Sequence, residues 1–168
     1  LYKDFPISPF YETLKQCWLW DMADKMIIPP THSVADNPAK NSLAYHCVNH
    51  QKFDWLARCS DLTNVEDTLV WLDYGIGHVP GVTVAVVKEF LQRIKEDDLA
   101  IPGCWTRDTI VLNDKVPCWR FCGGVMVVPT KKANKLYMAV RKNVRAHLQL
   151  TKNVSWEVNT LARIEPQM

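Results

Sequence analysis

Apolar residues recur every three or four positions in several stretches of the chain, which is the period of an amphipathic helix. The pattern predicts helices over residues 41–59 and 82–98 and a third long helix that Thr130 caps. Residues 8–26 follow the same period more loosely. Ser155 stands in position to cap a last, short helix.

Two other stretches are apolar without the helical period and predict strands. The run TLVWLDY, residues 68–74, is apolar on both alternating faces, so we expect an interior strand in which Trp71 and Leu72 are buried. The run WRFCGGVMVVP covers residues 119–129. Helices that alternate with buried strands indicate an α/β layered fold with helices on both faces of the sheet. A chain of 168 residues is expected to form one domain, residues 1–168.

Composition narrows the class of protein only a little. The contents of 48% hydrophobic and 23% charged residues are ordinary for a soluble globular chain. A net charge of +2, spread along the sequence, leads us to expect no nucleic-acid partner. No apolar run reaches the roughly 18 residues of a membrane span, so no transmembrane segment is expected. Six cysteines without a CxxC pair favour reduced thiols and a cytoplasmic location.

The stretch DYGIGH places Asp73 directly after a predicted strand. Ligands of open α/β sheets gather at the carboxyl ends of strands, and a carboxylate there can hold Mg²⁺ or Mn²⁺ together with phosphate oxygens. The alternative is a turn that Asp73 initiates and in which Gly75 and Gly77 supply positive φ angles. The spacing alone fits both interpretations.

Gly123 and Gly124 interrupt the second predicted strand. Paired glycines in a strand mark a bulge or the close approach of a ligand, and Arg120 nearby can face a phosphate or a carboxylate. A kinked strand with a surface arginine is the alternative. Cys118 and Cys122 lack the neighbouring histidines that a zinc site needs.

Three further polar residues are candidates for chemistry. His46 and His50 lie four positions apart, which is the geometry of a two-histidine zinc site, but Cys47 stands where a metalloprotease has glutamate. A solvated helix face is therefore the favoured interpretation, and a small zinc protein is the alternative. Glu157 lies near a helix N-terminus, where the helix dipole favours a carboxylate and where it can also act as a general base.

Four segments in a fixed order carry a resemblance to a known family. The segments NHQKFDWLARCSD, TLVWLDYGIGHV, WRFCGGVMVVP and SWEVNTLARIE lie between Asn41 and Glu165. They resemble the HtrL/YibB-like family of glycosyltransferases of bacteria and some viruses, whose motif W-[IL]-D-x-G-[IL]-x-H is complete from Trp71 to His78. That family is similar to GT-A enzymes, in which a carboxylate motif at the end of a central strand binds a divalent ion and the diphosphate of a nucleotide-sugar.

By position, the resemblance implies a role for several residues. Asp73 would bind the divalent metal, Mn²⁺ or Mg²⁺, with His78 or a distant carboxylate completing the site, and Glu157 would be the catalytic base or contact the acceptor. GT-A enzymes usually carry D-x-D, but Gly75 occupies the second aspartate position here, which leaves the metal dependence open. The residues implied in substrate binding are Lys52, Arg120, Gly123, Gly124 and Trp156.

The resemblance implies a glycosyltransferase that moves a sugar from a nucleotide-sugar donor to a glycan or another hydroxyl acceptor. A non-catalytic carbohydrate-binding module derived from such a fold is the alternative, since seven tryptophans suit stacking on sugar rings. GT-A domains open with a strand and loop that grip the nucleotide base. Because no such strand precedes Phe5 and the chain begins at Leu1, we expect that N-terminal residues are missing.

Overall fold

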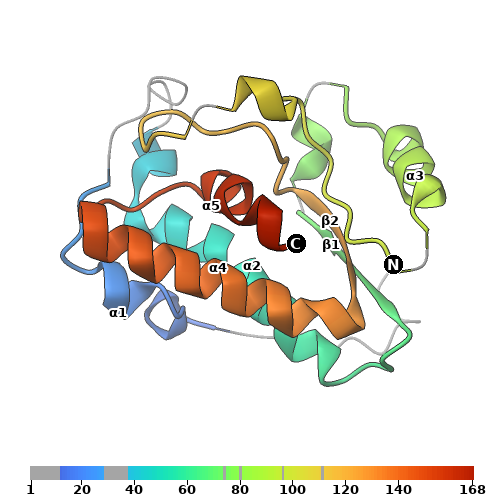
Figure 1. The fold of residues 1–168 in the computed structure, drawn as a ribbon, viewed down its shortest axis with the longest axis horizontal. Coiled ribbons are helices and arrows are strands. Elements are labelled where there is room, and N and C mark those ends of the chain that lie inside the picture. Colours follow the sequence, from blue (N-terminus) through green and yellow to red (C-terminus); the bar gives the residue numbers. More distant parts are fainter. Residues whose placement is uncertain (1–11, 29–37, 74, 80, 96, 111) are drawn as a thin grey trace.

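The computed structural model of the protein is a mixed α/β fold in which helices predominate (Figure 1). The structure describes residues 12–28, 38–73, 75–79, 81–95, 97–110 and 112–168. Its α-helices are α1 (Trp20–Ala23), α2 (Leu43–Ser60), α3 (Val84–Arg93), α4 (Thr130–Thr151) and α5 (Glu157–Ile164), and its strands are β1 (Thr68–Leu72) and β2 (Val125–Pro129). The expected α/β class is confirmed at this level.

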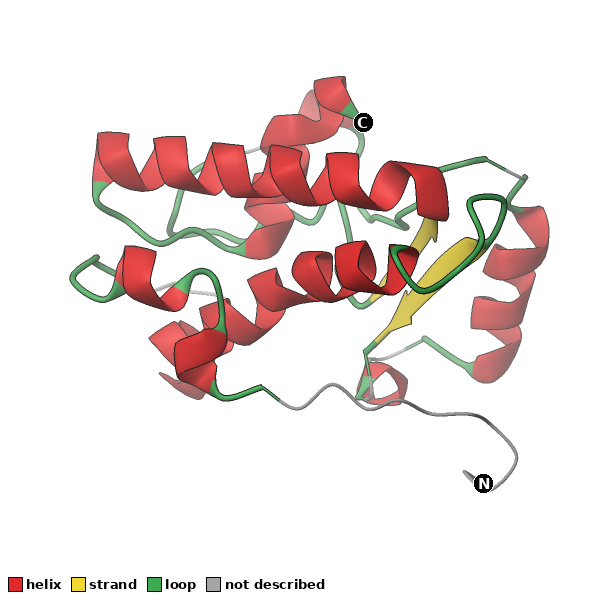
Figure 2. Cartoon of the chain, turned by 90° about the horizontal axis from the view of Figure 1, so that it is seen from below, coloured by secondary structure: helices red, strands yellow, loops and turns green. Residues whose placement is uncertain are grey.

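The two longest helices, α2 and α4, pack along each other and form the centre of the core. Figures 1 and 2 both show them side by side, with the sheet at one end of the pair. The hydroxyl of Ser42 accepts a hydrogen bond of 3.2 Å from the amide of Tyr45 and so caps the start of α2. The apolar stripe of α4 is buried as its period predicts, with Val140 fully inside.

Both predicted caps of the later helices are wrong. Thr130 is the first residue inside α4, and its hydroxyl lies 3.4 Å from that of Thr63. Ser155 lies two positions before α5, and its hydroxyl accepts a hydrogen bond from Arg163 at 3.0 Å. In each case the hydroxyl lies beside another side chain, 67 positions away for Thr130 and 8 positions away for Ser155, and the local capping pattern does not form.

Helix α2 buries a face that includes its two histidines. His46 and His50 are each 1% exposed, whereas Val48 is 47% exposed. The predicted solvated histidine face is therefore wrong. Because α2 packs against both α4 and α5, its buried surface is wider than a single apolar stripe.

Strands β1 and β2 form a two-stranded antiparallel sheet in the part of the chain that the structure describes. Every residue of β2 is buried. On the side of β2 away from β1, Ala100 and Val127 exchange two backbone hydrogen bonds of 2.8 and 2.9 Å. These neighbours explain why β2 is interior and β1 is not.

Strand β1 alternates between a packed and an exposed face. Leu69 and Trp71 pack against the core, and the indole of Trp71 stacks on that of Trp55 from α2 at 5.7 Å between ring centroids. Val70 and Leu72 face outward and are 49% and 51% exposed. The prediction of an interior strand with Leu72 buried is therefore wrong, and Trp71 is half-buried. Strand β1 is apolar on both faces, but the described part of the protein packs against only one of them.

Helix α3 is shorter than the predicted 82–98 helix and lies apart from the helical core (Figures 1 and 2). The hydroxyl of Thr83 accepts a hydrogen bond from the amide of Val86 at 3.2 Å and caps it. No residue of α3 is buried. Among the described helices, none has the length and apolar character that crossing a membrane requires.

Candidate functional site

Asp73 is the first residue after β1, where the sheet holds it through backbone and side chain. Its amide donates a hydrogen bond of 2.9 Å to the carbonyl of Gly124, which extends the β1–β2 pairing by one residue. Its Oδ1 accepts a hydrogen bond of 2.6 Å from the indole nitrogen of Trp71. Its carbonyl accepts the amide of Ile76 at 3.0 Å. The half-buried carboxylate is thus oriented by its own strand, with Oδ2 directed toward Gly124.

The Gly123–Gly124 pair lies between Asp73 and a second, buried carboxylate. A Cβ atom on Gly124 would lie 3.3 Å from Oδ2 of Asp73, and one on Gly123 would lie 2.7 Å from Oε1 of Glu157. At 2.7 Å something must move, so a side chain at position 123 would displace the carboxylate of Glu157. The predicted close approach at these glycines is therefore present, and the groups that approach are the protein's own side chains.

Lys52 and Glu157 form a buried ion pair behind Gly123. The ammonium of Lys52 lies 2.9 Å from the carbonyl of Gly123 and 3.4 Å from Oε1 of Glu157, with side chains 1% and 8% exposed. Burial alone would raise the pKa of Glu157, but the charge of Lys52, the two nearby histidines and a backbone hydrogen bond together outweigh burial and lower the pKa, so Glu157 is ionised at neutral pH. Its Oε2 is buried without a hydrogen-bond partner among the described residues.

The two histidines of α2 lie on the same side as this ion pair. Nδ1 of His50 lies 2.9 Å from the carbonyl of His46, and its Nε2 lies 3.5 Å from the hydroxyl of Thr160. Both ring nitrogens of His46 lack a partner among the described residues. Burial lowers the pKa of His46 to about 4 and also lowers that of His50, so both rings are neutral at neutral pH.

Two aromatic side chains, Tyr45 and Trp156, pack beside His46. The ring of Trp156 meets His46 at 5.5 Å and Tyr45 at 5.6 Å between centroids. Trp156 is 4% exposed and therefore belongs to the core, where a sugar ring has no face to stack on. Burial first, and then the charge of Glu157, raises the pKa of Tyr45 to about 12.

Arg120 is engaged elsewhere. Its guanidinium binds the carboxylate of Glu165 at 2.5 Å and the carbonyl of Trp105 at 3.2 Å, and it lies over the ring of Phe121. Arg107 binds the same carboxylate at 3.0 Å. The expected carboxylate partner of Arg120 is thus Glu165, close to the end of the chain.

The loop after Asp73 is only partly described. Gly75 has φ −88°, and neither Gly75 nor Gly77 has a positive φ, so the turn that would need glycine for that reason is not formed. The side chain of His78 lies outside the described residues. Within the described part of the chain, no three histidine, cysteine, aspartate or glutamate side chains gather as a group that could hold a metal.

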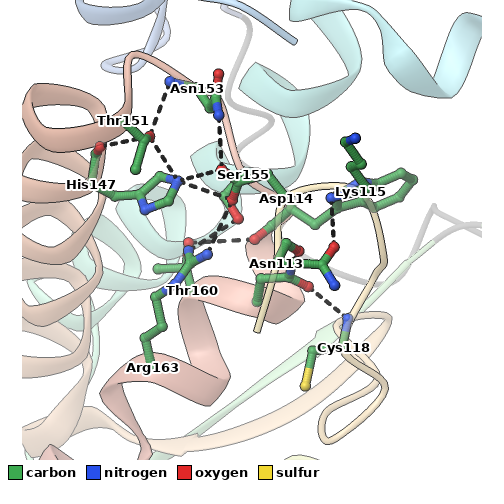
Figure 3. Close-up of polar contacts among 12 residues, drawn as sticks. Asn113, Asp114, Lys115, Cys118, His147, Thr151, Asn153, Ser155, Thr160 and Arg163 are labelled. Carbon is green, nitrogen blue, oxygen red and sulfur yellow. Dashed lines mark hydrogen bonds and ion pairs between the residues drawn. The ribbon is translucent and has the colours of Figure 1, made fainter. Parts of the chain in front are cut away.

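A second polar cluster surrounds Asp114 (Figure 3). Its carboxylate lies 3.0 Å from Nε2 of His147 in α4, and accepts hydrogen bonds from Asn153 at 3.2 Å and Arg163 of α5 at 3.1 Å. The hydroxyl of Thr151 lies 3.3 Å from the same Nε2. Because one nitrogen faces both carboxylate and hydroxyl, the histidine cannot relay a proton between them as in a catalytic triad. The cluster therefore joins chain segments.

The structure brings together Lys52, Asp73, Gly123, Gly124 and Glu157 from the set that the sequence indicated. Arg120 binds Glu165 instead, and Trp156 packs in the core against Tyr45 and His46. Sequence reasoning missed Trp71 as the partner of Asp73. The signal was present, because residues two apart on a strand share a face. It also missed Glu165 as the partner of Arg120, for which the sequence carries no local signal.

No family model, no curated protein and no solved structure matches this chain.

Proposed function

We propose that this chain is a GT-A-like glycosyltransferase domain of the HtrL/YibB-like family, which transfers a sugar from a nucleotide-sugar donor to a glycan or another hydroxyl acceptor. One observation carries the proposal. The Gly123–Gly124 backbone lies against Asp73 on one side and against Lys52 and Glu157 on the other. Asp73, Lys52 and Glu157 come from three of the segments that carry the family resemblance. All three side chains meet at the glycine dipeptide of the remaining segment.

The proposed donor site is at Asp73. Mg²⁺ and Mn²⁺ are bound by one or two carboxylates together with phosphate oxygens and waters, so a single oriented carboxylate fits such an ion. Oδ1 of Asp73 accepts a hydrogen bond from the indole of Trp71, and Oδ2, which is directed toward Gly124, is the oxygen that would bind the ion. When bound, the ion would neutralise charge on the leaving diphosphate.

Glu157 is the proposed partner of the acceptor. Lys52 helps to keep its carboxylate ionised, and an acceptor hydroxyl that reached the unpartnered Oε2, which is buried in this structure, would donate a hydrogen bond to it and transfer its proton. The rest of the acceleration would come from positioning and from the fixed charges around the site. Lys52 acts through Glu157 and the carbonyl of Gly123, and is therefore a positioning residue.

The experiment is a thermal-shift screen of nucleotide-sugars with and without Mn²⁺, carried out on the wild type, on Asp73→Asn and on Asp67→Asn. We expect one donor to stabilise the wild type in the presence of the metal. Asp73→Asn should weaken metal-dependent donor binding at least about tenfold and lower turnover by roughly two to three orders of magnitude. Its melting temperature without ligand should change little, because asparagine keeps the shape and the indole hydrogen bond.

Asp67→Asn is the matched control at the opposite end of β1. Oδ2 of Asp67 accepts the amide of Asn64 at 2.9 Å in an exposed turn, a role that asparagine also fills. This variant should bind donor as the wild type does. Unchanged Mn²⁺-dependent donor affinity in Asp73→Asn would remove Asp73 from the mechanism. Donor or glycan binding without any turnover would favour the alternative carbohydrate-binding module.

A further inference from the structure

Cys104 and Cys122 form a pair of thiols beside the glycine dipeptide. Their sulfur atoms lie 3.7 Å apart although the residues are separated by 18 positions in the chain. Cys104 is exposed and Cys122 is half-buried. Cys122 directly precedes Gly123. A bond between the two sulfurs would therefore act on the backbone that lies between Asp73 and Glu157.

Close backbone contacts hold the two thiol-bearing segments against each other. The amide of Cys104 donates to the carbonyl of Trp119 at 2.8 Å, and the amide of Cys122 donates to the carbonyl of Pro102 at 2.6 Å. A Cβ atom on Gly103 would lie 1.8 Å from the carbonyl oxygen of Arg120, so only glycine permits this approach. The proximity of the thiols therefore follows from the fold and not from side-chain mobility.

We propose that Cys104 and Cys122 are a dithiol modification site, which a low-molecular-weight disulfide such as oxidised glutathione converts to an intramolecular disulfide. A disulfide joins its sulfurs at about 2.0 Å, so closure requires an approach of about 1.7 Å from the present 3.7 Å. Side-chain rotation covers such a distance. This site is independent of the proposed sugar transfer, because its chemistry uses neither Asp73 nor Glu157.

The reaction proceeds by two thiol–disulfide exchanges. The Cys104 thiol loses its proton, and its sulfur attacks one sulfur of the small disulfide, which forms a mixed disulfide and releases one thiolate. The Cys122 sulfur then loses its proton, attacks the sulfur of Cys104 and releases the second thiolate. Two protein thiols are oxidised, one small disulfide is reduced, and the two protons end on the two released thiols.

The environment of the two thiols sets their order of reaction. Burial first, and then the hydrogen bond with Cys104, raises the pKa of Cys122 to about 11, so its thiolate is scarce at neutral pH. Cys104 is the exposed thiol of the pair, so its sulfur attacks the small disulfide first. Once Cys104 is in a mixed disulfide, its hydrogen bond and charge no longer oppose ionisation of Cys122.

The test equilibrates the full chain in glutathione buffers of increasing oxidised fraction, followed by acid quenching, alkylation and tryptic digestion. Closure gives one linked product that joins peptides 96–107 and 121–131. The same titration in concentrated urea measures closure in the unfolded chain. Because the fold holds the sulfurs together, the native protein should form the link in buffers at least about tenfold more reducing than the unfolded chain needs.

Three variants make the outcome specific. Cys122→Ser should accumulate glutathione on Cys104, Cys104→Ser should abolish the link, and Cys59→Ser, which removes another partly exposed thiol, should leave the link unchanged. The proposal is overturned if the native chain closes no more readily than the unfolded chain. It is equally overturned if the native wild type stops at the mixed disulfide, or if Cys122→Ser collects no glutathione on Cys104.

Discussion

Two clusters of charged side chains, one around the buried Glu157 and one around the half-buried Asp114, differ in how many hydrogen-bond partners surround the carboxylate. Asp114 is surrounded by donors from three segments, His147, Asn153 and Arg163 (Figure 3). Glu157 has the single cation Lys52 at 3.4 Å, and its Oε2 has no partner among the described residues. Glu157 is nevertheless the more deeply buried of the two, at 8% against 11% side-chain exposure.

The difference indicates what each cluster is for. A half-buried carboxylate that is bound by several donors stabilises one arrangement of the chain, which is the role expected of Asp114 between α4 and α5. A buried carboxylate with an unused oxygen costs stability, and such a cost is usually associated with binding or catalysis. The comparison therefore favours the Glu157 cluster as the functional one. The predictions below test this contrast.

The largest effect is expected from Lys52→Met. The variant leaves Glu157 buried without its cation, so the free energy of unfolding in urea should fall by roughly 3–5 kcal/mol. Adding Glu157→Leu should restore most of this loss, because two apolar side chains replace the pair without leaving a charge. Lys142→Met, at an exposed position of α4, is the control and should change stability by less than about 0.5 kcal/mol. A small effect of Lys52→Met would mean that water reaches Glu157.

The next largest effect is a dependence of stability on pH that arises from His46 in the Glu157 cluster. The pKa of His46 is lowered to about 4 from its ordinary 6.5, so the unfolded state binds more protons between these values. Stability should therefore be lost as the pH falls from about 6.5 to about 4, and His46 alone should account for about 3 kcal/mol of that loss. His46→Phe should remove this part of the slope in urea unfolding measured across the window.

The charges of Glu157 and His50 also act on the His46 ring. The difference in the slope of stability against pH between variants is therefore more informative than the wild-type slope alone. Tyr45→Phe is the matched control, because its ring also packs on Trp156 but does not titrate in this range. It should keep the wild-type slope. An identical slope in His46→Phe would show that His46 is hydrated or paired in solution.

The smallest effect is expected at the Asp114 cluster. Asp114→Asn removes the charge that Arg163 and His147 bind, which should cost about 2 kcal/mol at pH 7 and leave donor binding unchanged. Burial opposes ionisation of Asp114, but the hydrogen bond and charge of His147, with Asn153 and Arg163, lower its pKa below the ordinary 3.8. The stabilisation should thus be complete above pH 3.8 and be lost as the pH falls through the lower, folded value.

The difference in stability between wild type and Asp114→Asn, measured by urea unfolding, should not shrink between pH 7 and pH 5. Asp108→Asn, an exposed aspartate in the preceding segment, is the control and should be neutral at both pH values. A difference that already shrinks between pH 7 and pH 5 would contradict the lowered pKa. A loss of donor binding in Asp114→Asn would remove the contrast between the two clusters.

The sequence by itself determined the main elements and much of the site. The 3.6-residue period located α2 and α4, because one turn of a helix is a local property that a stretch of chain carries with it. The apolar runs located β1 and β2, and the strand-end position of Asp73 followed from them. The resemblance, not the spacing, grouped Lys52 and Glu157 with Asp73, since 105 positions separate that buried pair in the chain.

Only the tertiary structure decided which surfaces these elements bury and which polar groups meet. His46 lies inside and Val48 outside because α4 and α5 pack on one side of α2, and no pattern within α2 encodes the position of α5. Arg120 binds Glu165, and Ser155 accepts from Arg163, because a hydrogen bond depends on distance in space and not on position along the chain. Period and propensity are local, whereas burial and pairing are set by whatever the rest of the chain brings alongside.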